Sequence, residues 1–374
     1  MARVRFSDVV KRVNVFVDRE QTDLLYYVGG EHIDSDTFMV RKKGLIKGAT
    51  IGYKFHFGFQ PGHILFMSRN PHLRKCSMVD FAGVCSDSTY VVETRDENVL
   101  LQKYLLIEMQ SDRFWKWAEE NKSGSVNYLI NYCTLDSYEF DLPPIEEQRV
   151  LAAKLWAAND LKEKYQNLLA ATDEMLKAKF REMFGSLLSP KCAIVELSSV
   201  CKGHGEYGLA ASADDYDELK GRYIRITDID DFGQLNDEVV SPSVVDERFR
   251  LRVNDMLFAR TGNTVGKTYL HTDGFCLFAG YLIRYSPDET KINPVFLNNY
   301  THSKDYLDWV ENTKKVGAQP NISAKQYDKM PILLPSIDLQ REFVEIANTA
   351  EVSMLELKKS IASIDAVMRG LING

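Results

Sequence analysis

The segment Gly262-Asn-Thr-Val-Gly266-Lys267-Thr268 contains the residue types of a phosphate-binding loop. A nucleotide-hydrolysing P-loop places four residues between its first glycine and the Gly-Lys pair, so that consecutive backbone N–H groups wrap the phosphates. Here only three residues intervene, which argues against nucleotide hydrolysis. A short turn that presents donors to phosphate oxygens or base edges is the better interpretation. Its candidate donors are Arg260, Asn263, Thr264 and Lys267.

Other patterns resemble fragments of catalytic or metal sites, and each lacks an essential part. Cys201 and His204 have the spacing of half a zinc site, but no second pair of ligands follows. Asp141-Leu-Pro-Pro144 superficially resembles a methyltransferase loop, yet it lacks the aromatic residue that would stack on a target base. No glycine-rich turn suited to S-adenosylmethionine and no nucleophile–base pair stands out. We therefore predict recognition surfaces, with no catalytic centre, no metal and no cofactor in this chain.

The segment from Arg41 to Lys75 is strongly basic, although the whole chain carries a formal net charge of −7. It contains eight Lys and Arg residues and no Asp or Glu, with aromatic residues interleaved between Tyr53 and Phe59. Such a stretch is what a phosphate-facing surface needs. The alternative is a solvated basic face whose partners lie elsewhere. We favour the polyanion surface, with candidate contacts at Arg41, Lys42, Lys43, Lys47, Lys54 and Arg69.

Two parts of the chain repeat one another at a distance of 192 residues. The segment Asp141-Leu-Pro-Pro-Ile-Glu-Glu-Gln-Arg149 returns as Leu333-Leu-Pro-Ser-Ile-Asp-Leu-Gln-Arg341, and Ile64-Leu-Phe66 aligns with Met256-Leu-Phe258 at the same offset. Proline followed by acidic residues favours the start of a helix, and a long helical stretch follows each copy. The repeat predicts two similar binding surfaces, which suit a target in two parts better than a single active site.

The 374 residues exceed the roughly 100–200 expected for one domain, so the chain divides naturally into two domains and two helices. The expected boundaries are 1–143, 144–187, 188–334 and 335–374. In the first domain we expect strands at Ile64–Met67, Asp80–Val84 and Tyr90–Val92 and one helix over Val99–Asn121. In the second domain we expect strands at Arg222–Ile226, Met256–Ala259 and Tyr281–Tyr285, and a helix from Pro294 to about Lys314.

The two long helical stretches each carry an apolar seam. The first seam contains Leu151, Leu155, Ala158, Leu161, Tyr165, Leu168, Thr172 and Met175, and Gly185 is a plausible stop. The second contains Phe343, Ala347, Ala350, Met354, Leu357, Ile361, Ile364, Met368 and Leu371, which alternate in the steps of a coiled coil. We predict that the helices pair as an antiparallel coiled coil; the alternative is that each packs on its own domain. The expected fold is α+β, with a pseudo-two-fold internal repeat.

Composition supports a folded protein in a reducing compartment. The chain is 45% apolar and contains 18 Tyr and 19 Phe, enough for real cores. No run of 18 apolar residues occurs, so we expect a soluble protein without a membrane partner. The six cysteines lie far apart without a Cys-x-x-Cys pair, which indicates reduced, mostly buried thiols and a cytoplasmic location.

The order of several motifs resembles one known family. The motifs are Tyr223-Ile-Arg-Ile-Thr-Asp-Ile229 with Gly233-Gln-Leu235, the segment from Asp255 to Thr268, the segment Gly317-Ala-Gln-Pro-Asn-Ile-Ser323, and the repeated Leu-Pro-x-Ile-x-x-Gln helix entry. Over essentially the whole chain, this order is similar to that of specificity subunits of type I restriction-modification enzymes, with two target recognition domains. The candidate DNA contacts of the second domain are Arg225, Arg260, Asn263, Thr264, Lys267 and Asn321.

The resemblance implies a DNA-binding subunit without catalysis of its own. Such subunits bind two methyltransferase subunits and a restriction and translocation subunit, in which S-adenosylmethionine, ATP and Mg are used. Each domain would recognise one half of a split site in double-stranded DNA. The first domain departs from the pattern, because it lacks the Gly-Lys-Thr element and has Leu129-Ile-Asn131 where the second has Asn321-Ile-Ser323. The two domains are therefore expected to recognise different half-sites.

A coiled-coil scaffold with two domains that bind ligands other than DNA is the alternative function. It would explain the acidic net charge and the long helices. It would not explain the acid-free segment from Arg41 to Lys75 or the paired loops.

Overall fold

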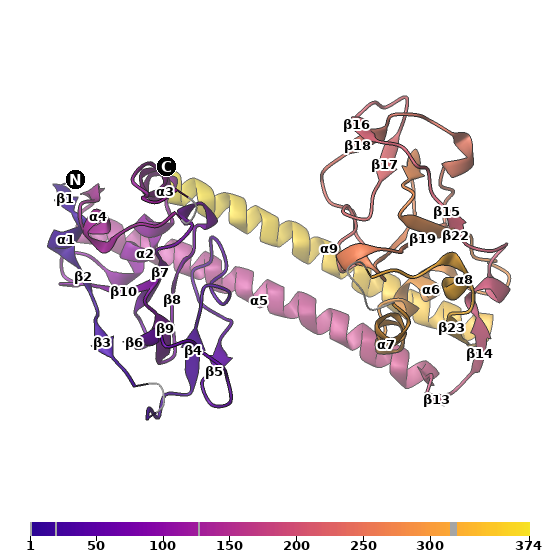
Figure 1. Ribbon diagram of the computed structural model, residues 1–374, viewed down its shortest axis with the longest axis horizontal. Coiled ribbons are helices and arrows are strands. Elements are labelled where there is room, and N and C mark those ends of the chain that lie inside the picture. Colours follow the sequence, from indigo (N-terminus) through magenta and orange to yellow (C-terminus); the bar gives the residue numbers. More distant parts are fainter. Residues whose placement is uncertain (1, 19–20, 126–127, 315–319) are drawn as a thin grey trace. The chain divides into compact units, whose positions relative to one another are not determined.

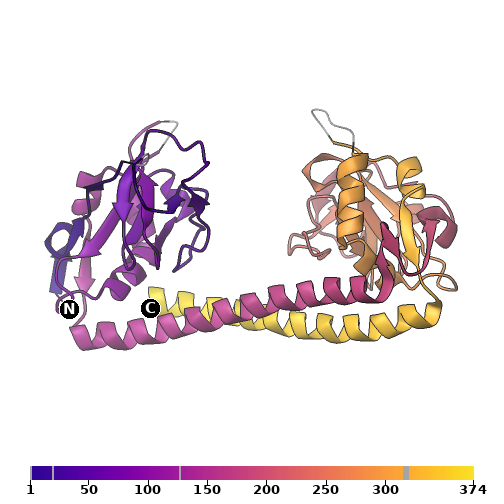
Figure 2. The same cartoon turned by 90° about the horizontal axis from the view of Figure 1, so that it is seen from below.

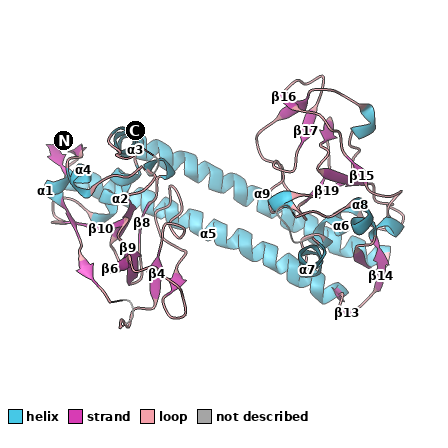
Figure 3. Cartoon of the chain, in the orientation of Figure 1, coloured by secondary structure: helices cyan, strands magenta, loops and turns pink. Residues whose placement is uncertain are grey.

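The computed structural model describes residues 2–18, 21–125, 128–314 and 320–374, which form two compact units. Unit 1 comprises Met1–Asn167 and Lys358–Gly374, and unit 2 comprises Leu168–Leu357. Each unit contains a β-rich domain together with one section of each long helix (Figure 1). The chain therefore has the expected α+β architecture, with strands confined to the two domains (Figure 3).

Unit 1 is built on two main sheets. One has four strands in the order β2-β10-β7-β8, and the other has five in the order β3-β6-β9-β4-β5; β1 and β11 form a separate pair. The strands are β1 (Ala2–Arg5), β2 (Val10–Arg12), β3 (Val15–Phe16), β4 (Tyr26–Val28), β5 (Gly44–Leu45), β6 (Phe55–Phe59), β7 (Ile64–Met67), β8 (Cys76–Met78), β9 (Gly83–Ser86), β10 (Thr89–Thr94) and β11 (Glu139–Leu142).

The helices of the first domain are short, and α2 packs against β8 and β10. They are α1 (Phe6–Val9), α2 (Gln102–Gln110), α3 (Asp112–Glu120) and α4 (Tyr132–Asp136). The expected single helix over Val99–Asn121 was wrong, because the chain breaks at Ser111. The backbone of Ser111 is extended, and its Oγ atom accepts the N–H of Phe114 at 3.2 Å, which caps α3.

Unit 2 repeats the four-stranded sheet in the order β15-β22-β19-β20, and its other strands form two-stranded sheets, including the parallel pair β17–β21. The strands are β12 (Gly185–Ser186), β13 (Ser189–Pro190), β14 (Ala193–Glu196), β15 (Glu206–Tyr207), β16 (Ala213–Asp215), β17 (Arg222–Ile224), β18 (Val240–Pro242), β19 (Met256–Ala259), β20 (Thr268–Leu270), β21 (Cys276–Phe278), β22 (Leu282–Tyr285) and β23 (Pro331–Leu334).

The helical segment of the second domain is also divided. Its helices are α6 (Pro294–Tyr300), α7 (Lys304–Thr313) and α8 (Ala324–Asp328). Here the expected continuous helix from Pro294 to Lys314 is interrupted before Lys304. The cause is the same as in unit 1: Ser303 is extended and its Oγ atom accepts the N–H of Tyr306 at 3.3 Å.

The internal repeat extends through the whole fold. The strand β7 corresponds to β19, β8 to β20 and β11 to β23, and each later strand begins 192 residues after the earlier one. The helices α2 and α6, α3 and α7, and α4 and α8 have the same offset. Because both units keep this order of elements, a feature at one position of unit 1 can be compared directly with its counterpart in unit 2.

The long helices α5 (Ile145–Phe184) and α9 (Ile337–Asn373) begin directly after the expected domain boundaries. Gly185 ends α5 with φ 79°, a left-handed conformation that glycine adopts without a Cβ clash. None of the described helices combines the length and the apolar character that crossing a membrane requires.

Within each unit, the sections of α5 and α9 lie side by side and run in opposite directions (Figure 2). In unit 1, Lys162 Nζ lies 2.5 Å from Asp365 Oδ1, and Met368 joins the core. In unit 2, the ring of Phe343 packs against Phe180 and Phe184 at 5.3 and 5.6 Å between centroids. The expected antiparallel pairing is therefore present in both units.

The expected seam of α5 is only partly right. Leu155 is buried, but Leu161, Leu168 and Met175 are 42%, 52% and 46% exposed. Trp156, Leu176, Phe180 and Phe184 are buried instead. The reason is that each end of α5 packs against its own domain as well as against α9, which turns a different face of the helix inward.

Candidate nucleic-acid interface

The loop after β19 is a turn whose own backbone hydrogen bonds close it. The N–H of Gly266 donates to the carbonyl of Ala259 at 3.0 Å, and the N–H of Lys267 donates to the carbonyl of Thr264 at 3.0 Å. The segment continues into the strand β20, where a P-loop would continue into a helix. These N–H groups are already paired, so the loop does not form a cradle for nucleotide phosphates.

The residues that leave β7 and β19 are bonded to a second segment in the same way in both units, and we call each such place the strand-exit site. In unit 1 it comprises Ser68 and Arg69 with residues 129–130, and in unit 2 Arg260 and Thr261 with residues 321–322. The N–H of Ile130 donates to Ser68 and that of Ile322 donates to Arg260, both at 2.9 Å. The strand-exit site is thus a fixed backbone frame that carries different side chains in the two units.

In unit 2 the strand-exit site brings Arg260 and Asn321 together. Arg260 Nε and Asn321 Oδ1 are both buried, and neither has a hydrogen-bond partner among the described residues. The guanidinium carbon of Arg260 lies 4.7 Å from the ring centroid of Tyr207, whose hydroxyl accepts the N–H of Ala324 at 3.1 Å. A buried donor and a buried acceptor without partners are costly, and a polar ligand would satisfy them.

Asn263 and Thr264 lie in the same loop. Asn263 is exposed, and the Thr264 hydroxyl donates to the carbonyl of Thr261 at 3.1 Å. Four of the six candidate contacts of the second domain, namely Arg260, Asn263, Thr264 and Asn321, are therefore gathered around one strand-exit site. Residues 317–319 of the motif that precedes Asn321 lie outside the described residues.

The other two candidates of the second domain pair with acids of the chain itself. Arg225 bonds Asp228 at 2.7 Å and Glu238 at 2.9 Å, and the hydrogen bond that it donates to Asp228 is the main cause that raises the pKa of the guanidinium above its ordinary value. Lys267 lies 2.9 Å from Asp231. Partners within the chain already engage these two cations, so they have less positive potential to offer a phosphate.

In unit 1, three of the candidate cations likewise face acids. Arg41 pairs with Asp80 and with Glu163 of α5, at 2.7 and 2.6 Å. Lys42 pairs with Asp34 at 2.7 Å, and Lys54 lies 3.6 Å from Asp87. The stretch is free of acids in sequence, but residues before and after it supply acids in space. Sequence reasoning missed this because the partners lie up to 122 positions away.

The remaining candidates of unit 1 are not neutralised in this way. The Lys43 ammonium lies 4.1 and 4.2 Å from the ring centroids of Tyr26 and Phe81. Lys47 and Arg69 are exposed, and within the described residues neither side chain forms an ion pair. Arg69 is part of the strand-exit site of unit 1.

Arg12, at the end of β2, was not among the predicted contacts. Its guanidinium carbon lies 5.2, 4.6 and 5.2 Å from the ring centroids of Phe57, Tyr90 and Tyr132. Arg12 lies outside the acid-free segment, and the three rings come from distant parts of the chain. No pattern in the sequence singled it out.

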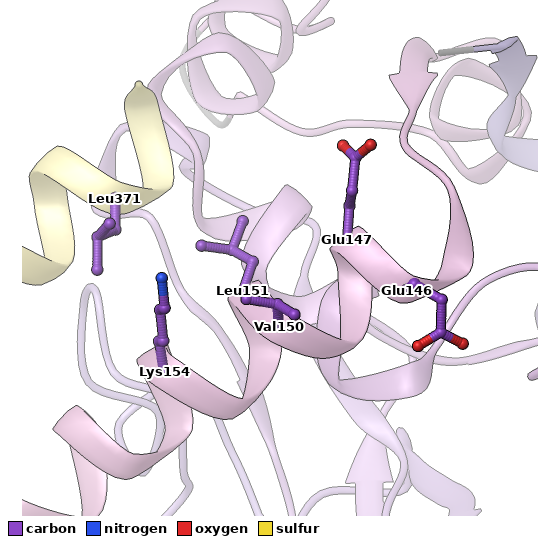
Figure 4. A pocket seen from close by; sticks show the side chains of 6 residues that line it. All are labelled: Glu146, Glu147, Val150, Leu151, Lys154 and Leu371. Atoms are coloured by element: carbon purple, nitrogen blue, oxygen red, sulfur yellow. The ribbon is translucent and has the colours of Figure 1, made fainter.

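The described residues hold no group of three or more His, Cys, Asp or Glu arranged for a metal ion. A pocket of about 350 Å³ lies on the helices of unit 1, lined by Glu146, Glu147, Val150, Leu151 and Lys154 of α5 and by Leu371 of α9 (Figure 4). Its wall is almost entirely apolar. All six cysteines are free thiols; four are buried, whereas Cys133 is exposed and Cys192 is partly so.

The chain thus consists of two repeated domains, each with a polar strand-exit site. No protein-family model matches the chain. A curated relative, the type I restriction enzyme EcoDI specificity subunit of Escherichia coli, is 25% identical over 130 residues. The matched segment covers 34% of this chain and 28% of that relative.

The fold is similar to that of solved chains from type I restriction-modification systems. The S subunit from M. genitalium aligns with a TM-score of 0.63 and 14% identity, covering 99% of this chain and 94% of that one. A chain from a structure of type I complex assembly and conformational transition aligns with a TM-score of 0.52 and 18% identity, covering 99% and 96%. These comparisons confirm the resemblance drawn from the motifs, and the chain has the fold of a type I specificity subunit.

Proposed function

We propose that this protein is the DNA-recognition subunit of a type I restriction-modification complex and has no catalytic activity of its own. Each of its two domains recognises one half of a bipartite site in double-stranded DNA. The observation that carries the proposal is the repeat itself, because the same backbone frame occurs at the strand-exit site of both units with different side chains. One frame with different polar groups is what a protein needs to read two different half-sites.

The chain has a formal net charge of −7, but the distribution of unpaired cations in the two domains supports a DNA-binding surface. Arg12, Lys47, Arg69 and Arg260 form no ion pair within the described residues, whereas most other basic candidates do. Unpaired cations lose the least when they meet a phosphate or a base edge, because they break no internal ion pair. The acid-bound cations hold the loops in place instead.

We also propose that two methyltransferase subunits and the restriction subunits supply the chemistry that this chain lacks, with S-adenosylmethionine, ATP and Mg bound in those partners. Exposed apolar residues on the long helices support docking of partners there. In unit 1 they include Val150 and Leu161, and in unit 2 Leu168, Met175 and Val352. A DNA target and six free thiols fit a location in the cytoplasm.

The experiment that tests the proposed function is single-molecule methylation sequencing of the host with and without the gene. We expect loss of methylation at one motif, made of two short half-sites around a fixed gap. An unchanged methylation pattern, together with no retention of the purified chain on duplex DNA at low salt, would contradict the proposal. It would favour the scaffold function instead.

A further inference from the structure

Arg12 in unit 1 is held by aromatic rings, and within the described residues its charge is paired with no acid. Its side chain is partly buried among Phe57, Tyr90 and Tyr132, and within the described residues it forms no ion pair and no hydrogen bond. Contacts of a guanidinium with ring faces restrict its rotation and leave its five edge N–H donors unused. Ordering this side chain costs conformational entropy, and within the described residues no acceptor pairs with it in return.

Other arginines of unit 1 show what a purely structural arginine looks like in this protein. Arg41 bonds Asp80 and Glu163, and Arg74 bonds Asp112 at 2.7 Å and the carbonyl of Gln110 at 3.1 Å. Both terminal nitrogens of each guanidinium donate to acceptors of the same chain. Arg12 differs, because its order comes from rings alone.

Arg12 is linked to the strand-exit site of unit 1 through the ring of Tyr90. Tyr90, the ring closest to Arg12, donates its hydroxyl to the carbonyl of Ile130 at 3.0 Å. The N–H of Ile130 bonds Ser68, which is the counterpart of Arg260. Unit 1 therefore has only a serine where unit 2 has Arg260, and a ring-bound arginine from β2 lies next to that serine's frame.

The second unit also places an arginine against an aromatic ring, but there the counterpart of β2 supplies the ring and not the arginine. There the arginine follows β19 and the ring, Tyr207, comes from β15, the strand that pairs with β22 as β2 pairs with β10. In unit 1 beside the strand-exit site, and in unit 2 within it, one arginine thus lies against an aromatic face and has no acid partner within the described residues. The two repeats therefore supply a similar guanidinium from different strands: Arg12 lies on β2 in unit 1, and Arg260 follows β19 in unit 2.

We propose that Arg12 is a specificity-determining residue of unit 1, and that it reads a guanine in one half-site while Arg260 reads a guanine in the other. This inference rests on the proposed function. Guanine presents O6 and N7 as two adjacent acceptors in the major groove, and the edge of a guanidinium bonds both at once. The rings hold the guanidinium in one orientation before DNA binds, which favours base recognition over a mobile phosphate contact.

The test uses the complex of the full chain with its methyltransferase subunits and a duplex that carries the motif found by methylation sequencing. Each guanine of the motif is replaced in turn by 7-deazaguanine, which lacks the N7 acceptor. For the native protein, we expect one guanine in each half-site at which this replacement weakens binding about tenfold or more. In Arg12→Lys this penalty disappears at one guanine of one half-site only, and in Arg260→Lys at one guanine of the other.

Controls separate this inference from the proposed function. Arg5→Lys, an exposed β1 arginine that faces Glu139 at 3.6 Å, keeps the native pattern. Arg12→Gln with an unchanged unfolding midpoint serves as a second variant if Arg12→Lys assembles poorly. The inference is overturned if a half-site has no N7-sensitive guanine, if the Arg12 variants keep both penalties, or if they weaken all duplexes equally. If the native complex does not prefer its motif over a scrambled duplex, the proposed function itself fails.

Discussion

The Oε1 atom of Gln340 accepts a hydrogen bond from the backbone N–H of Asn293 at 2.7 Å. The Nε2 atom of the same fully buried side chain donates to the carbonyls of Lys291 and Pro335 at 3.1 and 3.0 Å. Gln148 makes the same three bonds in unit 1, to Leu101, Val99 and Pro143. The glutamine of the repeated helix entry therefore ties the first turn of each long helix to the loop before α2 or α6.

Replacing Gln340 by alanine removes all three bonds and leaves one N–H and two carbonyls without partners in the core. Each buried unpaired group costs about 1–3 kcal/mol, so we expect a loss of roughly 2–5 kcal/mol in the free energy of unfolding. Urea denaturation measures it. Gln166→Ala, on the exposed surface of α5, should change the free energy by less than about 0.5 kcal/mol. A loss no larger than that in Gln340→Ala would show that the bonds are not needed.

His271 in unit 2 gives a pH-dependent contribution to stability. It is 1% exposed, and its burial lowers the pKa of the imidazole below the ordinary value of 6.5, although Asp255 acts in the opposite direction. The unfolded chain therefore binds a proton that the folded chain resists. The contribution of neutral His271 is fully present above pH 6.5 and is lost as the pH falls below it, by up to about 1.4 kcal/mol per pH unit.

The matched variant for this test is His271→Val. Val79 stands at the corresponding place in unit 1, where it accepts the N–H of Gly62 as His271 accepts that of Asn254. We expect unfolding of the variant to depend less on pH between 7.5 and 5.5 than that of the native protein. His63 and His302, whose pKa values burial also lowers, titrate in both proteins and cancel in the difference. Parallel pH curves would contradict the assignment.

Much of the fold was predictable because the repeat supplied two readings of the same pattern. The strands Ile64–Met67 and Met256–Ala259 were predicted with their observed bounds, and so was the end of α5 before Gly185. The breaks at Ser111 and Ser303 were missed, because helical periodicity continues through them. In each case a serine hydroxyl that caps the next helix decides the boundary, and periodicity does not detect a cap.

The candidate site was predictable only in part, for a related physical reason. Charge in sequence indicated where cations lie, but the ion pairs that occupy them form between distant segments, as Arg41 does with Glu163. The aromatic environment of Arg12 is equally non-local, since Phe57 and Tyr132 lie on β6 and α4. Sequence identified the loop of Arg260 and Asn263 because there the relevant residues are neighbours along the chain.

Lys47 and Lys42 form a matched pair for a salt-dependence experiment. Both are exposed in the same basic segment, but among the residues that the structure describes only Lys42 has an acid partner, Asp34. If Lys47 contacts a phosphate, Lys47→Ala should weaken DNA binding on all sequences and reduce the slope of log K against log salt by about 1. Lys42→Ala should change the slope much less. Fluorescence anisotropy over a range of salt concentrations gives both slopes. Equal slopes for the two variants would show that Lys47 and Lys42 do not differ in their contact with phosphate.

The N–H edge of the Arg260 guanidinium should contribute to the affinity for DNA, and the ring of Tyr207 should hold that guanidinium in place. Arg260→Ala is expected to cost about 1–3 kcal/mol of binding free energy to the cognate duplex, as for the loss of one base contact. Tyr207→Phe keeps the ring beneath the guanidinium, so it should retain most of the affinity and lose only the bond with the Ala324 N–H. Tyr207→Ala removes the ring and should approach the loss seen in Arg260→Ala. Isothermal titration calorimetry compares the three, with the exposed Arg341→Ala as a control for charge alone. If Arg260→Ala binds as tightly as the native chain, Arg260 is not a DNA contact and the unpaired atoms of its strand-exit site need another explanation.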